Sequence, residues 1–150
     1  WEVVGLVCCY KDTAATGIFT LTLRVALPSM LLVGHERIAE IVDARPATRF
    51  NAEADEPRAV LKRGHIPGAR NVPCGELVVN GGLKTSDELA AIFKRQGVNL
   101  QEPIIASCGS GVTAAVVILA LTTLGAENVK LYDGAWSEWG ARDDLPIEPV

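Results

Sequence analysis

The sequence predicts an α/β fold of the kind in which a mainly parallel central sheet is flanked by helices. Short apolar runs with the length of buried strands occur at 40–43, 103–107 and 129–132, and segments with helical spacing lie between them. Strands that alternate with helices favour parallel pairing, because each helix carries the chain back to the start of the next strand. The length of 150 residues and the hydrophobic content of 49% suit one packed domain.

The first segment, residues 1–29, is apolar but is interrupted by Lys11, Asp12, Arg24 and Pro28. No uninterrupted run approaches the about 20 apolar residues that a membrane-spanning helix needs. The segment also lacks the basic start of a signal peptide. We expect a linker or a divergent N-terminal segment that packs on another part of the protein, and we expect the chain to be a piece of a longer one.

Residues 30–40, MLLVGHERIAE, are compatible with a short helix. The stretch EIVDARP at 40–46 predicts a buried strand that ends at a turn, because Pro46 disfavours the helical conformation at Arg45. Residues 47–73 predict a long polar connection. Its turn-forming residues are Pro57, Gly64, Pro67 and Gly68.

The clearest helix is predicted over 85–97, TSDELAAIFKRQG. Thr85 or Ser86 can cap its N-terminus, and Gly97 can end it. Its apolar residues recur at helical spacing and form one face: Leu89, Ile92 and Phe93.

The remaining elements follow at short intervals. PIIAS at 103–107 predicts a buried strand, and VKLYDG at 129–134 predicts another. Between them, GVTAAVVILALTTLG at 111–125 predicts a helix that is apolar on most sides, so we expect other elements to cover it. AWSEWGARDDLP at 135–146 predicts a short helix and a tail.

Cys108 lies in the loop between a predicted strand and a predicted helix, a place where open α/β sheets bind ligands. Gly109 and Gly111 allow the backbone N–H groups to point inward, and the helix that begins near Val112 adds its positive end. Such a cradle would favour a thiolate or a persulfide on Cys108. The loop alone equally supports a small buried cysteine in a tight turn.

Two other cysteine chemistries are disfavoured by the spacing. Protein tyrosine phosphatases need an arginine six positions after the cysteine, where this chain has Ala114. Papain-like proteases need a histidine base and an orienting residue. The chain has only His35 and His65, and His65 lies in the turn GHIPGA, where a hydrogen bond that holds the turn is the simpler role.

Charge and cysteine content narrow the function further. The net charge is −4 and the basic residues are scattered, which disfavours nucleic-acid binding and a membrane anchor. The few cysteines form no CxxC pair, which argues against a zinc site and a secreted disulfide framework: Cys8, Cys9, Cys74 and Cys108. We expect reduced thiols in a cytoplasmic protein.

Several motifs occur in a characteristic order: DAR at 43–45, RF at 49–50, GHIPGARNVP at 64–73, CGSGVTA at 108–114 and YDGAWSEW at 132–139. Together they resemble the rhodanese superfamily over roughly 30–150. The loop CGSGVT is similar to that of the 3-mercaptopyruvate sulfurtransferases, whereas thiosulfate sulfurtransferases typically carry charged residues there, as in CRKGVT. The resemblance implies that 30–150 is the catalytic rhodanese domain, the C-terminal half of a two-domain bacterial enzyme.

The resemblance also implies a function for particular residues. Cys108 matches the nucleophile that takes sulfur from 3-mercaptopyruvate, releases pyruvate and passes the sulfur to a thiol or to cyanide. Arg49 matches the arginine that binds the substrate carboxylate, and Arg58 matches a second one; without the resemblance both would pass as surface charges. The loop supplies further substrate-binding residues: Gly109, Ser110, Gly111, Val112 and Thr113. Ser110 and Thr113 can donate hydrogen bonds to the keto oxygen or the transferred sulfur. No metal or organic cofactor is implied, because the persulfide carries the sulfur.

Other motif residues are expected to be structural. Asp43 and Arg45 should fix the end of a strand by turn and ion-pair contacts, although Arg45 is also a minor site candidate. Trp136 and Trp139 should pack the last helix on the sheet. Cys74 stands where the family usually has an aromatic residue.

Alternative functions are a thiosulfate sulfurtransferase, a persulfide relay that receives sulfur from a partner protein, and a silent interaction domain. An intact cysteine loop argues against the last, and a carboxylate clamp at Arg49 and Arg58 favours mercaptopyruvate over a relay. A missing N-terminal rhodanese domain, or self-association, would complete the assembly.

Overall fold

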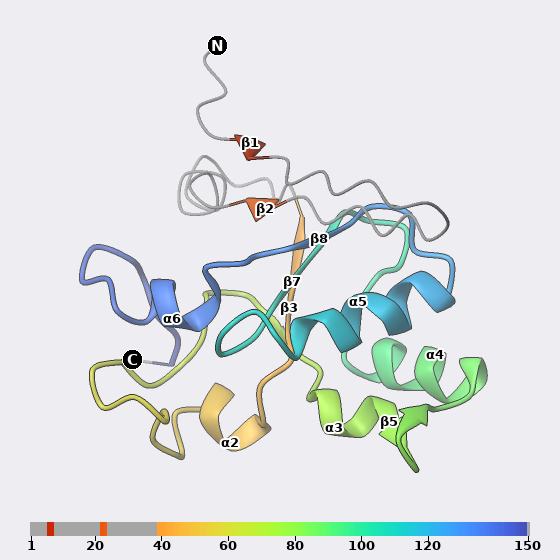
Figure 1. Cartoon of the computed structure of the whole chain (residues 1–150), viewed down its shortest axis with the longest axis horizontal. Helices are drawn as coiled ribbons and strands as arrows, with labels where there is room; N and C mark the ends of the chain where they lie inside the picture. The colour runs from red at the N-terminus through yellow and green to blue at the C-terminus, as the bar shows by residue number, and fades with distance from the viewer. Residues whose placement is uncertain (1–5, 8–21, 24–38, 150) are drawn as a thin grey trace.

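The computed structural model describes residues 6–7, 22–23 and 39–149, and its main sheet is mixed but largely parallel (Figure 1). The strand order is β1-β2-β8-β7-β3-β4, with β1 and β2 antiparallel and the other neighbours parallel. The strands are β1 (Leu6–Val7), β2 (Thr22–Leu23), β3 (Glu40–Asp43), β4 (Arg70–Asn71), β7 (Ile104–Ser107) and β8 (Val129–Leu131). A separate hairpin joins β5 (Val78–Val79) and β6 (Gly82–Leu83).

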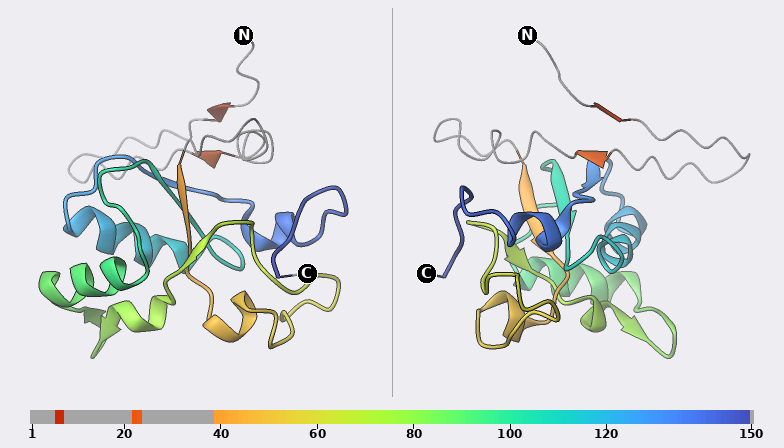
Figure 2. Two further views of the ribbon diagram at one scale, coloured as in Figure 1. Left: turned by 180° about the vertical axis from the view of Figure 1, so that it is seen from behind. Right: turned by 60° about the vertical axis from the view of Figure 1, so that its left-hand side comes forward.

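Helices follow most of these strands. They are α2 (Ala47–Phe50), α3 (Cys74–Leu77), α4 (Ser86–Arg95), α5 (Ala114–Thr123) and α6 (Ala135–Trp139). Figure 2 shows the helices distributed on both sides of the sheet. The α/β class predicted from the sequence is therefore confirmed.

The two faces of the sheet support two apolar clusters. Successive residues of a strand point to opposite faces, and Val42 and Ala106 accordingly join the cluster that packs under α3, α4 and α5. Their neighbours Ile41 and Ile105 join the other cluster, which contains Tyr132, Trp136 and Trp139. Trp136 and Trp139 are at most 1% exposed, which confirms that they pack α6 on the sheet.

The register brings two strand ends together at the same level. In the parallel pair β3 and β7, Asp43 lies opposite Ser107. Ala44 N–H then donates to the Ser107 carbonyl at 2.9 Å. Because the residues after each strand continue from the same edge, Arg45 and Cys108 both begin their loops at the carboxyl end of the sheet.

The best-predicted helix is α4. Thr85 caps it, its hydroxyl accepting the Glu88 N–H while the Glu88 carboxylate accepts the Thr85 N–H at 3.0 Å. The predicted apolar face is buried, and Gly97 has the positive φ of +72° that a chain leaving a helix often needs.

Two expectations were wrong. Residues 47–73 are not simply a connection, since they contain α2 and β4; Pro46 starts the helix, and β4 pairs with the end of β3. The helix α5 is not covered on all sides, because Leu119 is 50% exposed and Val112, just before it, is 73% exposed. The helix predicted over 30–40 lies outside the described residues except for its last two positions.

No helix in the described part of the chain is long and apolar enough to cross a membrane. The same residues contain no group of three or more histidine, cysteine or acidic side chains that could hold a metal ion. Cys74 and Cys108, the two cysteines within 39–149, are free thiols.

Candidate active site

The cysteine loop is fixed by the start of the following short helix, α6. Trp136 N–H donates to the Cys108 carbonyl at 2.9 Å, and Ser137 N–H donates to the Gly109 carbonyl at 3.0 Å. The Ser137 hydroxyl donates to the same Gly109 carbonyl at 2.6 Å. These bonds hold the carbonyl oxygens of Cys108 and Gly109 against α6.

Gly111 supplies the contact to the sulfur. Its N–H donates to Cys108 Sγ at 3.0 Å, a bond that a thiolate or a persulfide accepts better than a thiol does. Gly111 has a φ of +87°, and a Cβ atom there would lie 3.3 Å from the Asp133 carbonyl oxygen. Glycine is therefore required both by the backbone conformation and by the close approach. Cys108 itself is buried, with 1% of its surface exposed.

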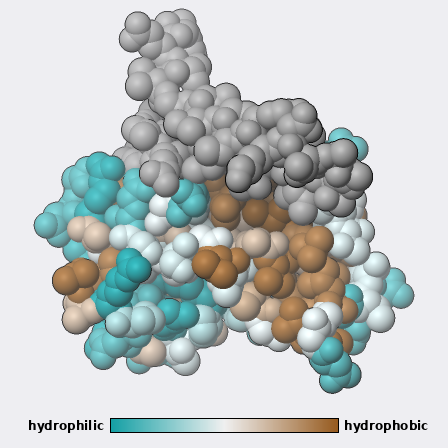
Figure 3. Space-filling model, in the orientation of Figure 1, coloured by the Kyte–Doolittle hydropathy of each residue, from teal (hydrophilic) through white to brown (hydrophobic). Residues whose placement is uncertain are grey.

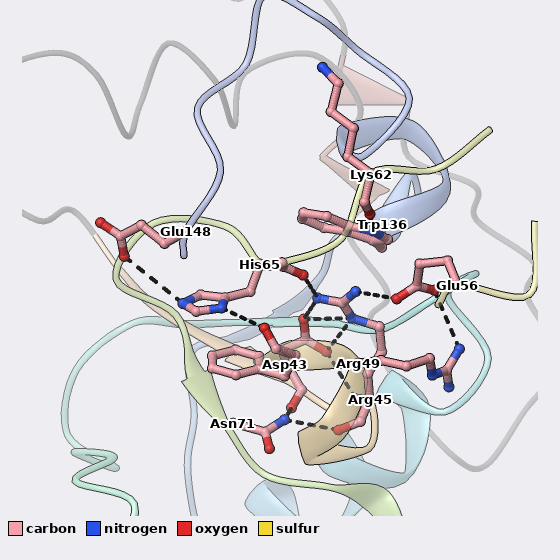
Figure 4. A network of polar contacts seen from close by, with 11 residues as sticks. Asp43, Arg45, Arg49, Glu56, Lys62, His65, Asn71, Trp136 and Glu148 are labelled. Carbon is pink, nitrogen blue, oxygen red and sulfur yellow. Dashed lines mark hydrogen bonds and ion pairs between the residues drawn. The ribbon is translucent and has the colours of Figure 1, made fainter. Parts of the chain in front are cut away.

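A buried ion-pair network lies beside this loop (Figure 4). The Arg45 guanidinium donates to both Asp43 carboxylate oxygens at 2.7–3.1 Å, to Glu56 Oε1 at 2.8 Å and to the Gly64 carbonyl at 2.8 Å. It also stacks over the Trp136 ring, 4.3 Å from its centroid. Each of its three nitrogen atoms donates within the fold, which supports the structural role expected for the residue that fixes the end of β3.

Arg49 extends from α2 toward the cysteine loop. Its Nη1 lies 3.4 Å from Glu56 Oε2, and its side chain is 25% exposed. The same nitrogen lies 3.8 Å from where a Cβ atom on Gly109 would stand. The side chain is thus oriented by Glu56 but keeps most of its hydrogen-bond donors available for a ligand.

These groups line one pocket of about 210 Å³. Among the predicted site residues, it brings together Arg49, Arg58, Gly109 and Ser110. Gly111 instead contacts the Cys108 sulfur. Thr113 stands at the N-terminus of α5, and neither it nor Val112 lines the pocket. Cys108 itself does not line the pocket, which reaches the cysteine loop at Gly109 and Ser110. Two guanidinium groups beside this uncharged part of the loop can bind a small anion.

Four further lining residues were not predicted: Glu56, Pro57, Leu61 and Ser137. Glu56 is two positions before Arg58 in the sequence. This closeness to a candidate arginine is the sequence feature that could have identified it as a pocket residue. Ser137 lies inside the motif YDGAWSEW, in which the sequence predicts a packing role only for Trp136 and Trp139. Its hydroxyl supports the loop directly.

His65 has the structural role that the sequence predicted. Its Nδ1 lies 2.8 Å from the Phe50 carbonyl, and its ring stacks on Phe50 with centroids 3.7 Å apart. It does not line the pocket. Tyr132, which directly follows β8, is also packed in the core, and burial raises the pKa of its hydroxyl above the ordinary value.

Comparisons with known proteins agree with this geometry. The 3-mercaptopyruvate sulfurtransferase of Escherichia coli (strain K12) is 69% identical over 126 residues, which cover 84% of this chain and 45% of that protein. The mouse 3-mercaptopyruvate sulfurtransferase is 45% identical over 104 residues, covering 69% of this chain and 35% of its own. The crystal structure of the E. coli 3-mercaptopyruvate sulfotransferase SseA superposes with a TM-score of 0.65 at 60% identity, covering 85% of this chain and 46% of that one. The chain thus spans about half the length of the E. coli relatives.

The family model for the rhodanese-like domain matches residues 30–142. That range includes β3, β7 and β8 and the whole pocket. On the sequence match, the shared fold and the position of the cysteine loop, this chain belongs to the rhodanese family.

Proposed function

We propose that this chain is the catalytic rhodanese domain of a 3-mercaptopyruvate sulfurtransferase. The observation that carries the proposal is the pocket in which Arg49 and Arg58 meet the backbone of the loop that bears Cys108. A guanidinium group binds a carboxylate with two parallel hydrogen bonds. The side chains of the cysteine loop are uncharged, so the positive charge of the pocket comes from Arg49 and Arg58. This arrangement suits a donor whose negative charge is separated from the sulfur that it transfers.

In the proposed first step, the Cys108 thiolate attacks the thiol sulfur of 3-mercaptopyruvate. An S–S bond forms and the C–S bond breaks, so the electron pair moves to carbon and gives the enolate of pyruvate. The proton of the donor thiol balances the step by converting the enolate to pyruvate, which leaves Cys108 as a persulfide anion. The transferred sulfur is oxidised from the thiol to the persulfide level while the donor carbon is reduced and gains a hydrogen, so the step needs no external oxidant or reductant.

In the second step, an acceptor attacks the outer sulfur of the persulfide. Cyanide takes it to form thiocyanate, and a thiolate takes it to form a new persulfide; in both cases the S–S bond breaks and Cys108 returns as a thiolate. Gly111 N–H can stabilise the anionic sulfur at each stage, since it already contacts Sγ. Ser110 is proposed to donate to the keto oxygen, with Val112 and Thr113 completing the binding loop.

The cellular setting is also proposed. A small-molecule donor and a thiol or cyanide acceptor are the partners, and the cytoplasm is the compartment, because it keeps thiols reduced. Because the chain spans about half of its E. coli relatives, residues 30–150 are proposed to work with an N-terminal rhodanese domain or with a second copy. No nucleic acid, membrane or metal takes part in the proposed reaction.

The proposal is tested by comparing kcat/KM for 3-mercaptopyruvate and thiosulfate at a fixed cyanide concentration. Mercaptopyruvate should be preferred, because thiosulfate is a compact dianion and the loop has no cationic side chain for it. Equal or reversed values favour a thiosulfate sulfurtransferase. Transfer only from a protein persulfide would indicate a relay.

A further inference from the structure

Glu56 is a buried carboxylate in the wall of a pocket proposed to bind an anion. Its side chain is only 1% exposed, and the residue lines the pocket beside Arg49 and Arg58. Oε1 accepts from Arg45 at 2.8 Å, and Oε2 accepts from Arg49 at 3.4 Å. A carboxylate in this position opposes the binding of a second negative charge.

Glu56 does not complete the neutralisation of Arg45, since Asp43 already does so through both of its carboxylate oxygens. Glu56 therefore adds a negative charge that acts on Arg49 and on the pocket as well as on Arg45. The charged residues that line the pocket are two arginines and this one glutamate, which leave a net charge of +1. Without Glu56 the same lining would carry +2.

We propose that Glu56 sets the charge of the pocket and thereby weakens its attraction for dianions more than its attraction for donors with a single negative charge. The inference rests on the proposed function and deepens it. 3-Mercaptopyruvate with a neutral thiol carries one carboxylate, whereas thiosulfate carries two negative charges. Because electrostatic energy scales with the product of the charges, the glutamate penalises the dianion about twice as strongly.

The test uses Glu56→Gln, which keeps the shape and one oxygen acceptor but removes the charge. The ratio of kcat/KM for thiosulfate to that for mercaptopyruvate should rise roughly tenfold, as expected for removing a unit charge several ångströms away in a partly solvated site. Glu56→Asp retains the charge and should keep the wild-type ratio. Glu76→Gln, which removes a carboxylate from the surface ion pair with Arg95, is the matched control and should also leave the ratio unchanged.

A purely geometric role gives a different result. If Glu56 only held Arg49 in place, Glu56→Gln and Glu56→Asp would lower the rates with both donors in the same proportion. An unchanged ratio in Glu56→Gln therefore overturns the proposal.

A binding measurement tests the proposal even if the Glu56 variants do not fold or if the chain transfers no sulfur. In the Cys108→Ala chain, calorimetry with perchlorate and sulfate compares tetrahedral ions of one and two charges. A sulfate preference of less than tenfold supports a net charge near +1, and a preference of tenfold or more contradicts it. This experiment needs neither a variant of Glu56 nor sulfur transfer, so it decides about the pocket charge even if Cys108 loads from neither donor and the proposed function fails.

Discussion

In the proposed function, recognition of the donor depends most directly on Arg49. A charge-assisted hydrogen-bonded contact contributes about 1.5–3 kcal/mol, so Arg49→Leu should lower kcat/KM for mercaptopyruvate roughly ten- to a hundred-fold. If the carboxylate is held equally in the ground and transition states, most of the loss will appear in KM. Steady-state kinetics with cyanide as acceptor measure both parameters.

A second donor distinguishes recognition from support of the loop. Transfer from a small persulfide that lacks a carboxylate should be nearly unchanged in Arg49→Leu. Arg63→Leu removes a more exposed arginine, paired with Asp55, and should affect neither donor. An equal loss with both donors in Arg49→Leu would show that Arg49 supports the loop or the persulfide charge instead.

At the scale of single elements, α4 offers a local test of stability. Thr85→Ala removes the hydroxyl that caps the helix, and the loss of such a cap typically costs about 1 kcal/mol of the free energy of unfolding. Ser86→Ala, at the next position, makes a matched control with little expected effect. Urea unfolding followed by circular dichroism gives both values; equal stability of Thr85→Ala and wild type would refute the capping role.

The same cap has a pH dependence. Hydrogen bonds from Thr85 hold the pKa of Glu88 below its ordinary value of 4.5. A carboxyl group with a lowered pKa in the folded state stabilises the fold above its unfolded pKa and loses that contribution as the pH falls. The difference between wild type and Thr85→Ala should therefore shrink on acidification below that value.

The elements that the sequence predicted best are those with local signals. The helix α4 carries its own cap and apolar face, and β7 is a short apolar run buried throughout. The strand β4 could not be predicted in this way, because its two residues become a strand only by pairing with Val42 and Asp43 far upstream. Its sequence, Arg70 and Asn71, has no strand pattern of its own.

The candidate site residues also divide into those with a signal in the sequence and those that depend on contacts in the folded chain. The glycine-rich loop between strand and helix made Cys108 a candidate, and the resemblance to a family then favoured it and added Arg49 and Arg58 as candidates. Glu56 was missed because an acidic residue in a polar segment normally lies on the surface. Its burial depends on Arg45, a contact that only the folded chain creates.

At the scale of the whole molecule, the surface over α5 exposes large apolar side chains. In Figure 3, hydrophobic side chains gather in the region where Figure 1 shows α5. Val112, just before α5, and Leu119, within it, are 73% and 50% exposed. Exposed apolar surface of this kind binds hydrophobic dyes and promotes association.

We expect the chain to bind such a dye and to self-associate at high concentration. Leu119→Lys should reduce both, as measured by dye fluorescence and sedimentation velocity. Thr122→Lys adds the same charge at another exposed position of α5 that carries no large apolar side chain, and it should have a smaller effect. A strictly monomeric wild-type chain without dye binding would contradict the expectation.

The central claim is that Cys108 carries the transferred sulfur, and the mass of its peptide tests this most directly. The chain is incubated with 3-mercaptopyruvate without an acceptor, digested under non-reducing conditions and analysed by mass spectrometry. The account predicts a gain of one sulfur atom on the peptide that contains Cys108, its loss on addition of cyanide, and no gain on the peptide that contains Cys74. An unmodified Cys108 peptide, or sulfur on Cys74 that persists in Cys108→Ser, would contradict it.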